Sequence, residues 1–389
     1  MKVLFHRYGS ICEPDIINVF LLSGLEVTED KIEISQKNIP GDIRIKIIAD
    51  YLFESAYSFV FSINFFPYIS DVCEKFQIPY VCYSVDCPVL ELFSQSIHNS
   101  MNRIFLFDYS QYSLFHPQNP DHIYYLPLAT NPSRWDQVLD HISPEDRYRY
   151  SGDISFVGSL YIEKSPFFSQ IIPEHIRGYI DGISQSQLLL PECNFSEDLI
   201  MDELLTYLKD TYPNFPSIPD AWQNTDTYAA SHLYLDMHVS ALERLNILQK
   251  LSSKYSVNLY TRSDSSALPD ITAKGGVSTL TEMPKVFNLS KINLNITMRS
   301  IQSGLPLRIF DIMGCHGFLL SDYQSELPEY FQIGNDCDCY ETFDELDEKV
   351  NYYLTHDDIR MEIAENGYQK VIQHHTWFHR VSTILKTVF

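Results

Sequence analysis

The sequence predicts an α/β protein of two domains, each built on a parallel β-sheet wound with helices. The chain of 389 residues exceeds the size at which a single hydrophobic core usually divides. Strand-like and helix-like segments alternate in both halves, as they do in parallel sheets. A polar stretch with proline and charges, residues 131–152, separates the halves. We therefore expect domains over residues 1–150 and 151–373, followed by a final helix over residues 374–389.

The first domain alternates predicted strands and helices. The strands are Val3–His6, Ser58–Ile63, Tyr80–Val85, Arg103–Phe107 and Ile123–Leu126. The helices are Pro14–Ser23, Asp42–Ser55, Pro67–Phe76 and Tyr109–Phe115. Ligands of such sheets bind where the strands end at their carboxyl edge. The candidate site residues of this domain are therefore the polar residues at these ends, His6, Arg7, Asn64, Asp86 and Asp108.

The second domain repeats this pattern around an insertion. Its predicted strands are Ile154–Val157, Val257–Tyr260 and Ile292–Ile296. A Gly158-Ser159 turn follows the first strand. An insertion with several prolines is expected near residues 191–236, and the amphipathic helix Val239–Leu251 follows it.

Charge and cysteine usage exclude several classes of partner. A net charge of −23 opposes binding to nucleic-acid phosphates and to an anionic membrane surface, so a soluble acceptor is expected. No apolar run reaches the roughly 20 residues that span a bilayer, and no signal-peptide pattern is visible. Eight cysteines without a regular framework suit reduced thiols in a cytoplasm.

The most informative segment is LPLRIFDIMGCHGFLLSD, residues 305–322, which is typical of a helix, a glycine turn and a buried strand. Arg308 and Asp311 are three residues apart and share one helix face. Pro306 suits the first turn of the helix, and Gly317 suits the turn into the strand. The helix therefore offers polar groups to a ligand.

This segment resembles the donor-binding helix of GT-B glycosyltransferases, in which an acidic residue of an E-A-M-A-C-G-like motif holds the ribose of a sugar nucleotide. Residues 310–317 occupy the motif, with one residue inserted before the final glycine. From Lys285 to HHTWFHR the chain is similar to the group 1-like C-terminal domain of the CgeB-like spore-maturation glycosyltransferases. The stretches FSINFFPYISDVCEKFQIPYVCYSVDCP, NRIFLFDYS and YYLPLATNPSRW are similar to the N-terminal domain often joined to it.

The resemblance implies the GT-B fold, with two Rossmann-like domains whose parallel sheets face an interdomain cleft. It places the nucleotide sugar, most commonly a UDP-sugar, on the C-terminal domain, with Asp311 on the ribose. It also implies that the final helix crosses back to the N-terminal domain.

Stabilisation of a departing diphosphate is the central chemical requirement of sugar transfer. GT-B enzymes generally meet it with basic side chains and helix N-termini. The D-x-D at residues 336–338 falls late in an acidic segment, so we expect no metal site and no required cofactor. The basic candidates are Lys164, Arg262, Arg299 and Arg308, for each of which a salt bridge is the alternative role. The other expected donor contacts are Gly158, Ser159, Tyr260, Ser300, Leu305 and Asp311.

The sequence departs from the family at one position. Many retaining members carry a glutamate eight residues before the ribose acid, and this chain has Ser303 there. The donor sugar must then be recognised differently, for example by backbone N–H groups of residues 300–305. The stereochemical outcome is therefore left open.

Two residues compete as the base that takes the acceptor proton. Asp86 follows a strand and matches an acidic position of the family, although an aspartate before a helix is also an ordinary N-cap. His6 is the second candidate, because it ends the first strand and an imidazole titrates near neutrality.

These observations predict a cytoplasmic, metal-independent glycosyltransferase that moves a hexose-type sugar from a nucleoside diphosphate, such as UDP, to a soluble protein or glycan. One alternative is a nucleotide-sugar epimerase or phosphorylase on the same fold. Another is a non-catalytic sugar-nucleotide-binding or structural protein, which the missing first acidic residue favours.

Overall fold

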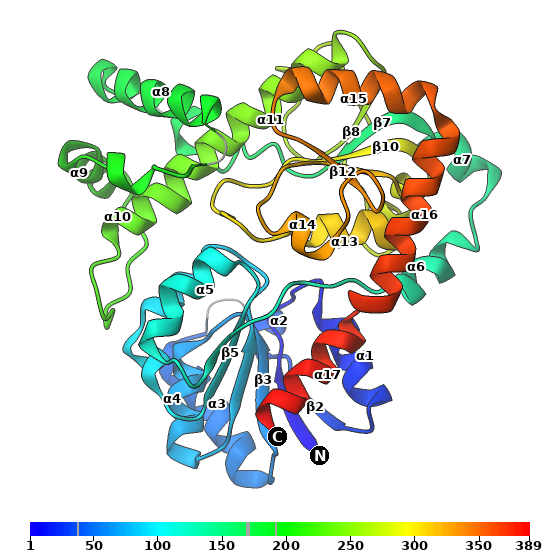
Figure 1. Cartoon of the computed structure of the whole chain (residues 1–389). Helices are drawn as coiled ribbons and strands as arrows, with labels where there is room; N and C mark the ends of the chain where they lie inside the picture. The colour runs from blue at the N-terminus through cyan, green and yellow to red at the C-terminus, as the bar shows by residue number, and fades with distance from the viewer. Residues whose placement is uncertain (37–38, 169–171, 191–192) are drawn as a thin grey trace. The chain divides into compact units, whose positions relative to one another are not determined.

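The computed structural model describes residues 1–36, 39–168, 172–190 and 193–389, which divide into two compact units (Figure 1). Each unit contains one six-stranded sheet whose neighbouring strands are parallel. The predicted α/β class with two parallel sheets is thereby confirmed. The first unit comprises Met1–Leu128, Ser217–Thr225 and Trp377–Phe389, and the second comprises Ala129–Pro216 and Asp226–Thr376. The predicted domain limits at residues 150 and 373 remain predictions.

The sheet of the first unit has the order β2-β1-β3-β4-β5-β6. Its strands are β1 (Lys2–His6), β2 (Glu26–Asp30), β3 (Phe59–Ile63), β4 (Tyr80–Tyr83), β5 (Asn102–Leu106) and β6 (Ile123–Tyr125). Its helices are α1 (Glu13–Leu22), α2 (Ile32–Ser35), α3 (Gly41–Glu54), α4 (Pro67–Phe76), α5 (Tyr109–Phe115) and α17 (Trp377–Val388), with 3₁₀ turns η1 (Leu90–Phe93), η2 (Gln95–His98) and η3 (His116–Gln118). Every strand and helix predicted in residues 1–130 is present, with ends that differ by at most about two residues.

The edge strand β2 and the four-residue helix α2 were missed. The sequence of β2, EVTED, is polar and only its last residue is buried. The interior strands β3 and β4 are apolar runs buried along their whole length, as expected for strands covered on both faces. Phe20 of α1 packs its ring against Phe5, Phe59 and Phe61 of the sheet.

Two distant stretches complete the first unit. In residues 217–225, the Trp222 ring stacks on Phe93 with centroids 5.3 Å apart, and its indole N–H donates to the Leu92 carbonyl. In α17, the Trp377 ring centroid lies 6.0 Å from that of Tyr83. The Arg380 guanidinium donates to the backbone carbonyls of Pro127 and Leu128. The first unit therefore depends on residues from three parts of the chain.

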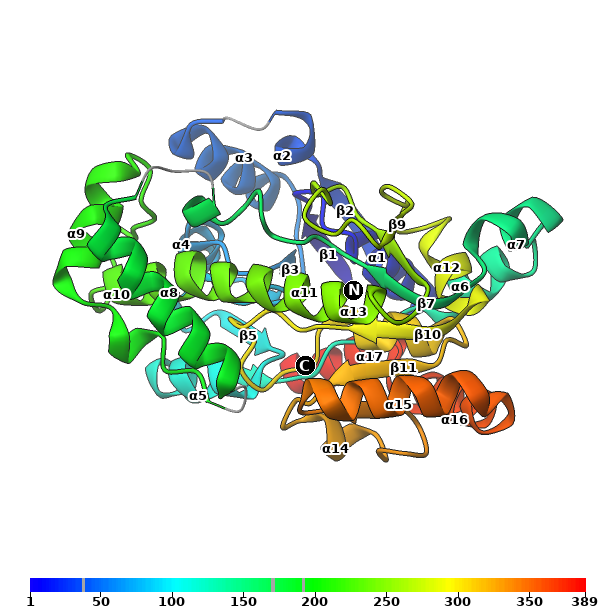
Figure 2. The same cartoon turned by 90° about the horizontal axis from the view of Figure 1, so that it is seen from above.

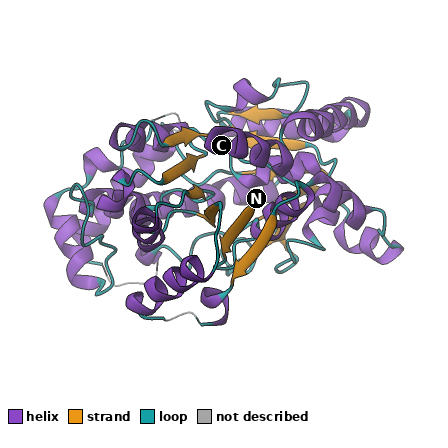
Figure 3. Ribbon diagram, turned by 90° about the horizontal axis from the view of Figure 1, so that it is seen from below, coloured by secondary structure: helices purple, strands orange, loops and turns teal. Residues whose placement is uncertain are grey.

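The sheet of the second unit has the order β12-β11-β10-β7-β8-β9. Figure 3 shows that the helices of the molecule lie around its strands. Its strands are β7 (Gly152–Val157), β8 (Val257–Tyr260), β9 (Thr272–Ala273), β10 (Ser290–Asn295), β11 (Leu319–Asp322) and β12 (Asp338–Tyr340). Its helices outside the insertion are α6 (Pro132–Leu139), α7 (Pro144–Tyr150), α11 (Asp236–Ser252), α12 (Met283–Leu289), α13 (Leu307–Gly314), α14 (Leu327–Tyr330), α15 (Phe343–Thr355) and α16 (Asp357–His374), with η4 (Pro166–Phe168). Leu248 and Leu251 of α11 join the core with Ile154, Leu259 and Leu294 of the strands.

A helical segment separates β7 from α11 in the second unit; its described residues are 172–190, 193–216 and 226–235. It contains α8 (Glu174–Leu189), η5 (Glu197–Leu199), α9 (Asp202–Thr211), α10 (Asp226–Ala229) and the π-helical turn η6 (Ala230–Leu235). Figure 2 shows α8 beside the long helix α11. Ile176, Ile180, Leu204 and Leu208 of this segment form an apolar core together with Val239 of α11.

Both ends of α13 differ from the predicted geometry. Pro306 is the N-cap residue, so the helix begins one residue after it. The left-handed backbone conformation falls on His316, with φ 57°, and not on Gly317. Gly317 is required instead by close packing, because an added Cβ would lie 2.8 Å from the Phe287 carbonyl oxygen.

Candidate functional site

Asn64 joins the strand ends of the first unit. It has a left-handed backbone, with φ 59°, at the carboxyl end of β3. Its side-chain N–H₂ donates to the Asp86 carboxylate at 2.6 Å and to the Tyr8 hydroxyl at 2.9 Å. Its side-chain oxygen accepts from the Val85 backbone N–H at 3.0 Å. The structure thus brings together two of the predicted strand-end residues, Asn64 and Asp86.

Asp86 is solvent-exposed in the bend after β4. The expected alternative, an N-cap role, is not what the structure shows, because the next turn, η1, is capped at Val89 without a side-chain bond. Asp108 does cap α5, since its carboxylate accepts from the Gln111 backbone N–H at 2.7 Å. Asp86 therefore has an accessible carboxylate whose described contact is with Asn64.

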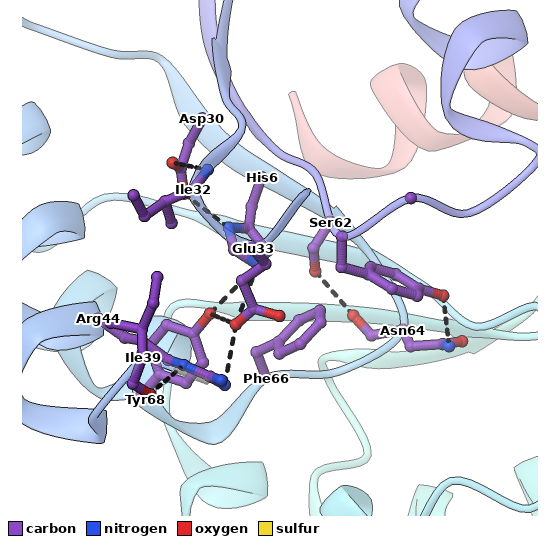
Figure 4. A network of polar contacts seen from close by, with 12 residues as sticks. His6, Asp30, Ile32, Glu33, Ile39, Arg44, Ser62, Asn64, Phe66 and Tyr68 are labelled. Atoms are coloured by element: carbon purple, nitrogen blue, oxygen red, sulfur yellow. Dashed lines mark hydrogen bonds and ion pairs between the residues drawn. The ribbon is translucent and has the colours of Figure 1, made fainter. Parts of the chain in front are cut away.

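His6 lies in the interior of the first unit with no exposed surface (Figure 4). Its Nδ1 lies 2.8 Å from the Asp30 carboxylate, and its Nε2 lies 3.1 Å from the Tyr68 hydroxyl. Tyr68 also donates to Glu33, which forms an ion pair with Arg44. Burial raises the pKa of Tyr68, and the Glu33 carboxylate raises it further. Both His6 ring nitrogens are thus engaged within the protein.

In the second unit, the turn after β7 holds a polar cluster. The Gly158 N–H donates to the Tyr260 carbonyl, and Ser159 donates to Glu163 at 2.9 Å. Lys164 is exposed, with its ammonium 5.1 Å from the centre of the Tyr161 ring. Burial raises the pKa of Tyr260 to about 12, so its phenol stays neutral.

Arg244 of α11 is a buried cation that the sequence analysis missed. Its guanidinium donates to the Ser159 carbonyl at 2.7 Å and to the Ile296 carbonyl at 2.5 Å. It also lies 4.2 Å from the centre of the Tyr161 ring. Arg244 thereby ties together the loops that follow β7 and β10. Its place on the polar side of the predicted helix Val239–Leu251 was the signal that could have found it.

The two predicted arginines beyond β8 and β10 have different surroundings. Arg299 forms a two-pronged ion pair with Glu243, with N–O distances of 2.5 Å and 3.1 Å. Burial raises the pKa of Glu243, while the Arg299 charge lowers it. Arg262 is exposed, and its stem covers the backbone of Gly276. The predicted salt-bridge alternative is therefore observed for Arg299, within the second unit.

Arg308 and Asp311 contact different neighbours of α13. The Arg308 guanidinium donates to the Met283 sulfur and lies 5.3 Å from the centre of the Phe287 ring, both on α12. The Asp311 carboxylate accepts from the Thr130 hydroxyl at 2.7 Å. Burial lowers the pKa of Arg308, and the Asp311 charge opposes this effect.

The loop between β10 and α13, residues 296–306, contains the predicted Ser300 and Leu305, and both are buried. Ser303, which stands eight residues before Asp311, donates its hydroxyl to the buried Glu326 carboxylate at 2.7 Å. A carboxylate from the loop after β11 thus lies beside the position where the sequence lacks an acid. No local sequence signal connects Ser303 with Glu326, because 23 residues separate them.

The D-x-D residues have structural partners in the second unit. The Asp338 carboxylate accepts from Lys349 at 2.9 Å and from the Tyr353 hydroxyl at 2.6 Å. Asp336 accepts from the Gln332 backbone N–H at 2.9 Å. Among the residues that the structure describes, no three His, Cys, Asp or Glu side chains are grouped as metal ligands. Within the same described part of the chain, no helix is long and apolar enough to cross a bilayer.

Comparison with known proteins defines the class of fold. Residues 244–386, which include α13, match the model of a family described as glycosyl transferase-like. No curated protein matches the chain in sequence. The chain has the GT-B fold of glycosyltransferases, as the solved structures below show, and the family match is confined to its residues 244–386.

Three similar structures cover the whole chain. Alr3699/HepE of Anabaena, in complex with UDP and glucose, is 12% identical over 100% of both chains, with a TM-score of 0.54. Sucrose-phosphate synthase of Thermosynechococcus elongatus is 8% identical over 100% of this chain and 99% of its own, with a TM-score of 0.54. A UDP-forming α,α-trehalose-phosphate synthase of Burkholderia xenovorans is 9% identical over 100% and 98%, with a TM-score of 0.55.

Proposed function

We propose that the protein is a metal-independent glycosyltransferase that moves a sugar from a UDP-sugar to a soluble protein or glycan in the cytoplasm. The observation that carries this proposal is the glycosyl transferase-like match over residues 244–386, a stretch that includes the β10–α13 loop and α13. The structures of Anabaena Alr3699/HepE are complexes with UDP and with UDP-glucose, which supports UDP as the carrier. The resemblance to CgeB-like proteins supports a protein or glycan acceptor.

Distinct roles are proposed for the polar residues of the second unit. Asp311 accepts hydrogen bonds from the ribose, and backbone N–H groups near Ser300 and Leu305 contact the donor. Arg299 and Arg308 balance the charge of the diphosphate, and Lys164 and Arg262, both exposed, can approach it from solvent. Gly158, Ser159 and Tyr260 line the same strand ends.

Asp86 is proposed as the base that deprotonates the acceptor hydroxyl. Its carboxylate is exposed at the carboxyl edge of the first sheet, where ligands of parallel sheets bind. The Asn64 amide holds it in place through a 2.6 Å hydrogen bond. His6 is the weaker proposal, since its ring is fully buried.

A thermal-shift screen of nucleotides tests the donor class. UDP and UDP-glucose are expected to raise the melting temperature, because a ligand at 100 times its Kd stabilises the fold by about 2.7 kcal/mol. Adenosine and guanosine diphosphates at equal concentration are the controls for unspecific anion binding. If neither UDP nor UDP-glucose raised the melting temperature, the proposal would be contradicted.

Slow hydrolysis of the donor separates an enzyme from the non-catalytic alternative. Release of free sugar from the UDP-sugar that gives the largest shift is expected. An isomerised UDP-sugar would favour the epimerase alternative, and tight binding without any conversion would favour a binding or structural protein.

Chelation tests the proposed independence of metal. Turnover is expected to survive excess EDTA, because arginine side chains and helix N–H groups can stabilise the leaving diphosphate. Activity is measured before and after dialysis against EDTA and after addition of magnesium or manganese. Loss of turnover that manganese restores would overturn this part of the proposal.

A further inference from the structure

A buried ion triad in the helical segment does not belong to the site described above. His232 of η6 places its Nδ1 2.7 Å from the Asp236 carboxylate and its Nε2 2.8 Å from the Glu197 carboxylate. His232 and Asp236 are buried, and Glu197 is half-exposed. An ionised carboxylate only accepts hydrogen bonds. An imidazole between two carboxylates therefore donates from both ring nitrogens, which requires a proton on each nitrogen and a positive charge on the ring. These three residues are called the His232 triad.

The titratable groups that surround His232 come from three elements. Glu197 lies on η5 and Asp236 begins α11, and the Tyr228 ring of α10 packs 4.4 Å from the imidazole. Burial lowers the pKa of His232, but the hydrogen bonds that its ring donates to Asp236 and Glu197 outweigh this effect and raise the pKa to about 9. The triad is therefore in its charged form at neutral pH.

Asp236 connects the triad to the β10–α13 loop through two hydrogen-bonded paths. Its carboxylate accepts from the Asn194 amide at 2.9 Å, and the same amide group donates to the Arg299 carbonyl at 3.1 Å. Its backbone carbonyl accepts from Ser240 at 2.6 Å, and the Ser240 oxygen accepts from the Arg299 N–H at 2.9 Å. Both backbone polar groups of Arg299 are thus held by partners of Asp236.

The chain geometry at the triad is unusual. Residues 230–235 form a π-helical turn, a distortion that is uncommon in helices and is frequent at functional sites. The turn passes directly into Asp236, the first residue of α11. Ser196, whose hydroxyl donates to the Asp236 carboxylate at 2.6 Å, adds a further bond to this residue.

We propose that His232 and Asp236 are positioning residues that hold the β10–α13 loop in the conformation that binds the donor diphosphate. The helical segment thereby sets donor affinity without contact with the donor. This inference rests on the proposed function only in naming the donor as the ligand of the loop.

Hydrogen exchange of the unliganded protein tests the positioning without any nucleotide. In His232→Gln, the amides of residues 297–304 are expected to exchange roughly three- to tenfold faster, because one lost hydrogen bond is worth about that factor. His175→Gln is the matched control, since His175 pairs with Glu203 in the same helical segment but at the surface. Equal exchange of residues 297–304 in wild type and His232→Gln would overturn the proposal.

The pH dependence of the same amides gives a readout that a general packing defect does not produce. The pKa of His232 is raised in the folded protein, so the triad is fully stabilising below about pH 6.5 and loses this effect as the pH rises through about 9. Protection of residues 297–304, corrected for intrinsic exchange, is expected to fall between pH 7 and 9.5 in wild type and to stay flat in His232→Gln. Identical profiles would contradict the role of the charged imidazole.

Donor affinity is then measured by calorimetry with UDP. His232→Gln and Ser240→Ala are each expected to weaken UDP binding roughly three- to tenfold. Ser240→Ala is a mild change that serves if His232→Gln does not fold, and Ser252→Ala on the same helix is its control, because that hydroxyl bonds only within α11. Unchanged affinity in both variants overturns the coupling. If wild type binds no UDP, the proposed function fails, while the exchange experiments still decide the positioning.

Discussion

Replacement of Asp86 by asparagine is expected to lower turnover about 10²–10⁴-fold, the usual contribution of a general base. The asparagine keeps a carbonyl oxygen that can accept from the Asn64 amide, so the bend after β4 is expected to keep its structure. The affinity for UDP, which is assigned to the second unit, is expected to stay nearly constant. Steady-state kinetics and UDP titration of Asp86→Asn measure the two quantities separately.

Asp71→Asn is the matched control for this change. Asp71 is also an exposed carboxylate of the first unit that accepts from an asparagine amide, that of Asn99, at 2.9 Å. Its replacement is expected to leave turnover unchanged. Near wild-type turnover in Asp86→Asn would remove Asp86 from the mechanism. His6→Ala, which takes the imidazole from the buried Asp30, is expected instead to lower thermal stability.

Replacement of Asp311 by alanine is expected to weaken UDP binding by about 1.5–3 kcal/mol, the value of hydrogen bonds to a charged group. The reason is the proposed pair of bonds from the ribose hydroxyls to the carboxylate. Calorimetric titration of UDP into the variant measures the loss, and circular dichroism confirms that the fold is retained.

Thr130→Val separates the ribose role from the internal role of Asp311. Thr130 donates to Asp311 and accepts from the Trp135 indole N–H at 2.8 Å, so this variant removes the same internal bond from its other end. It is expected to lower stability while UDP affinity changes little. If both variants weaken UDP binding equally, Asp311 acts by holding the protein together and not by holding the ribose.

The sequence was sufficient for those parts of the fold that depend on local pattern. Apolar runs such as β3 and β8, and the helix pattern of α4, were predicted because burial and period are encoded within a few residues. The polar edge strand β2 was missed, since only its partner β1 makes it a strand. The GT-B class was reached through the motif around Asp311.

The contacts of the candidate site were less predictable, because they depend on which distant residues meet. Arg308 and Asp311 share a helix face in sequence, yet α12 and Thr130 give them separate partners. Glu326 reaches Ser303 from another loop, which no periodicity indicates. The i, i+4 spacing of His232 and Asp236 was a local signal that could have been read.

The composition of the first unit has a consequence for biosynthesis. Its interior includes Trp377 of α17 against Tyr83 of β4, with ring centroids 6.0 Å apart. Domains usually fold in order as they leave the ribosome, but this sheet is synthesised before the second unit and its covering helix α17 after it. While the second unit is being translated, the apolar surface at Tyr83 is not yet covered by α17. The first unit therefore completes its core only after the second unit has been synthesised.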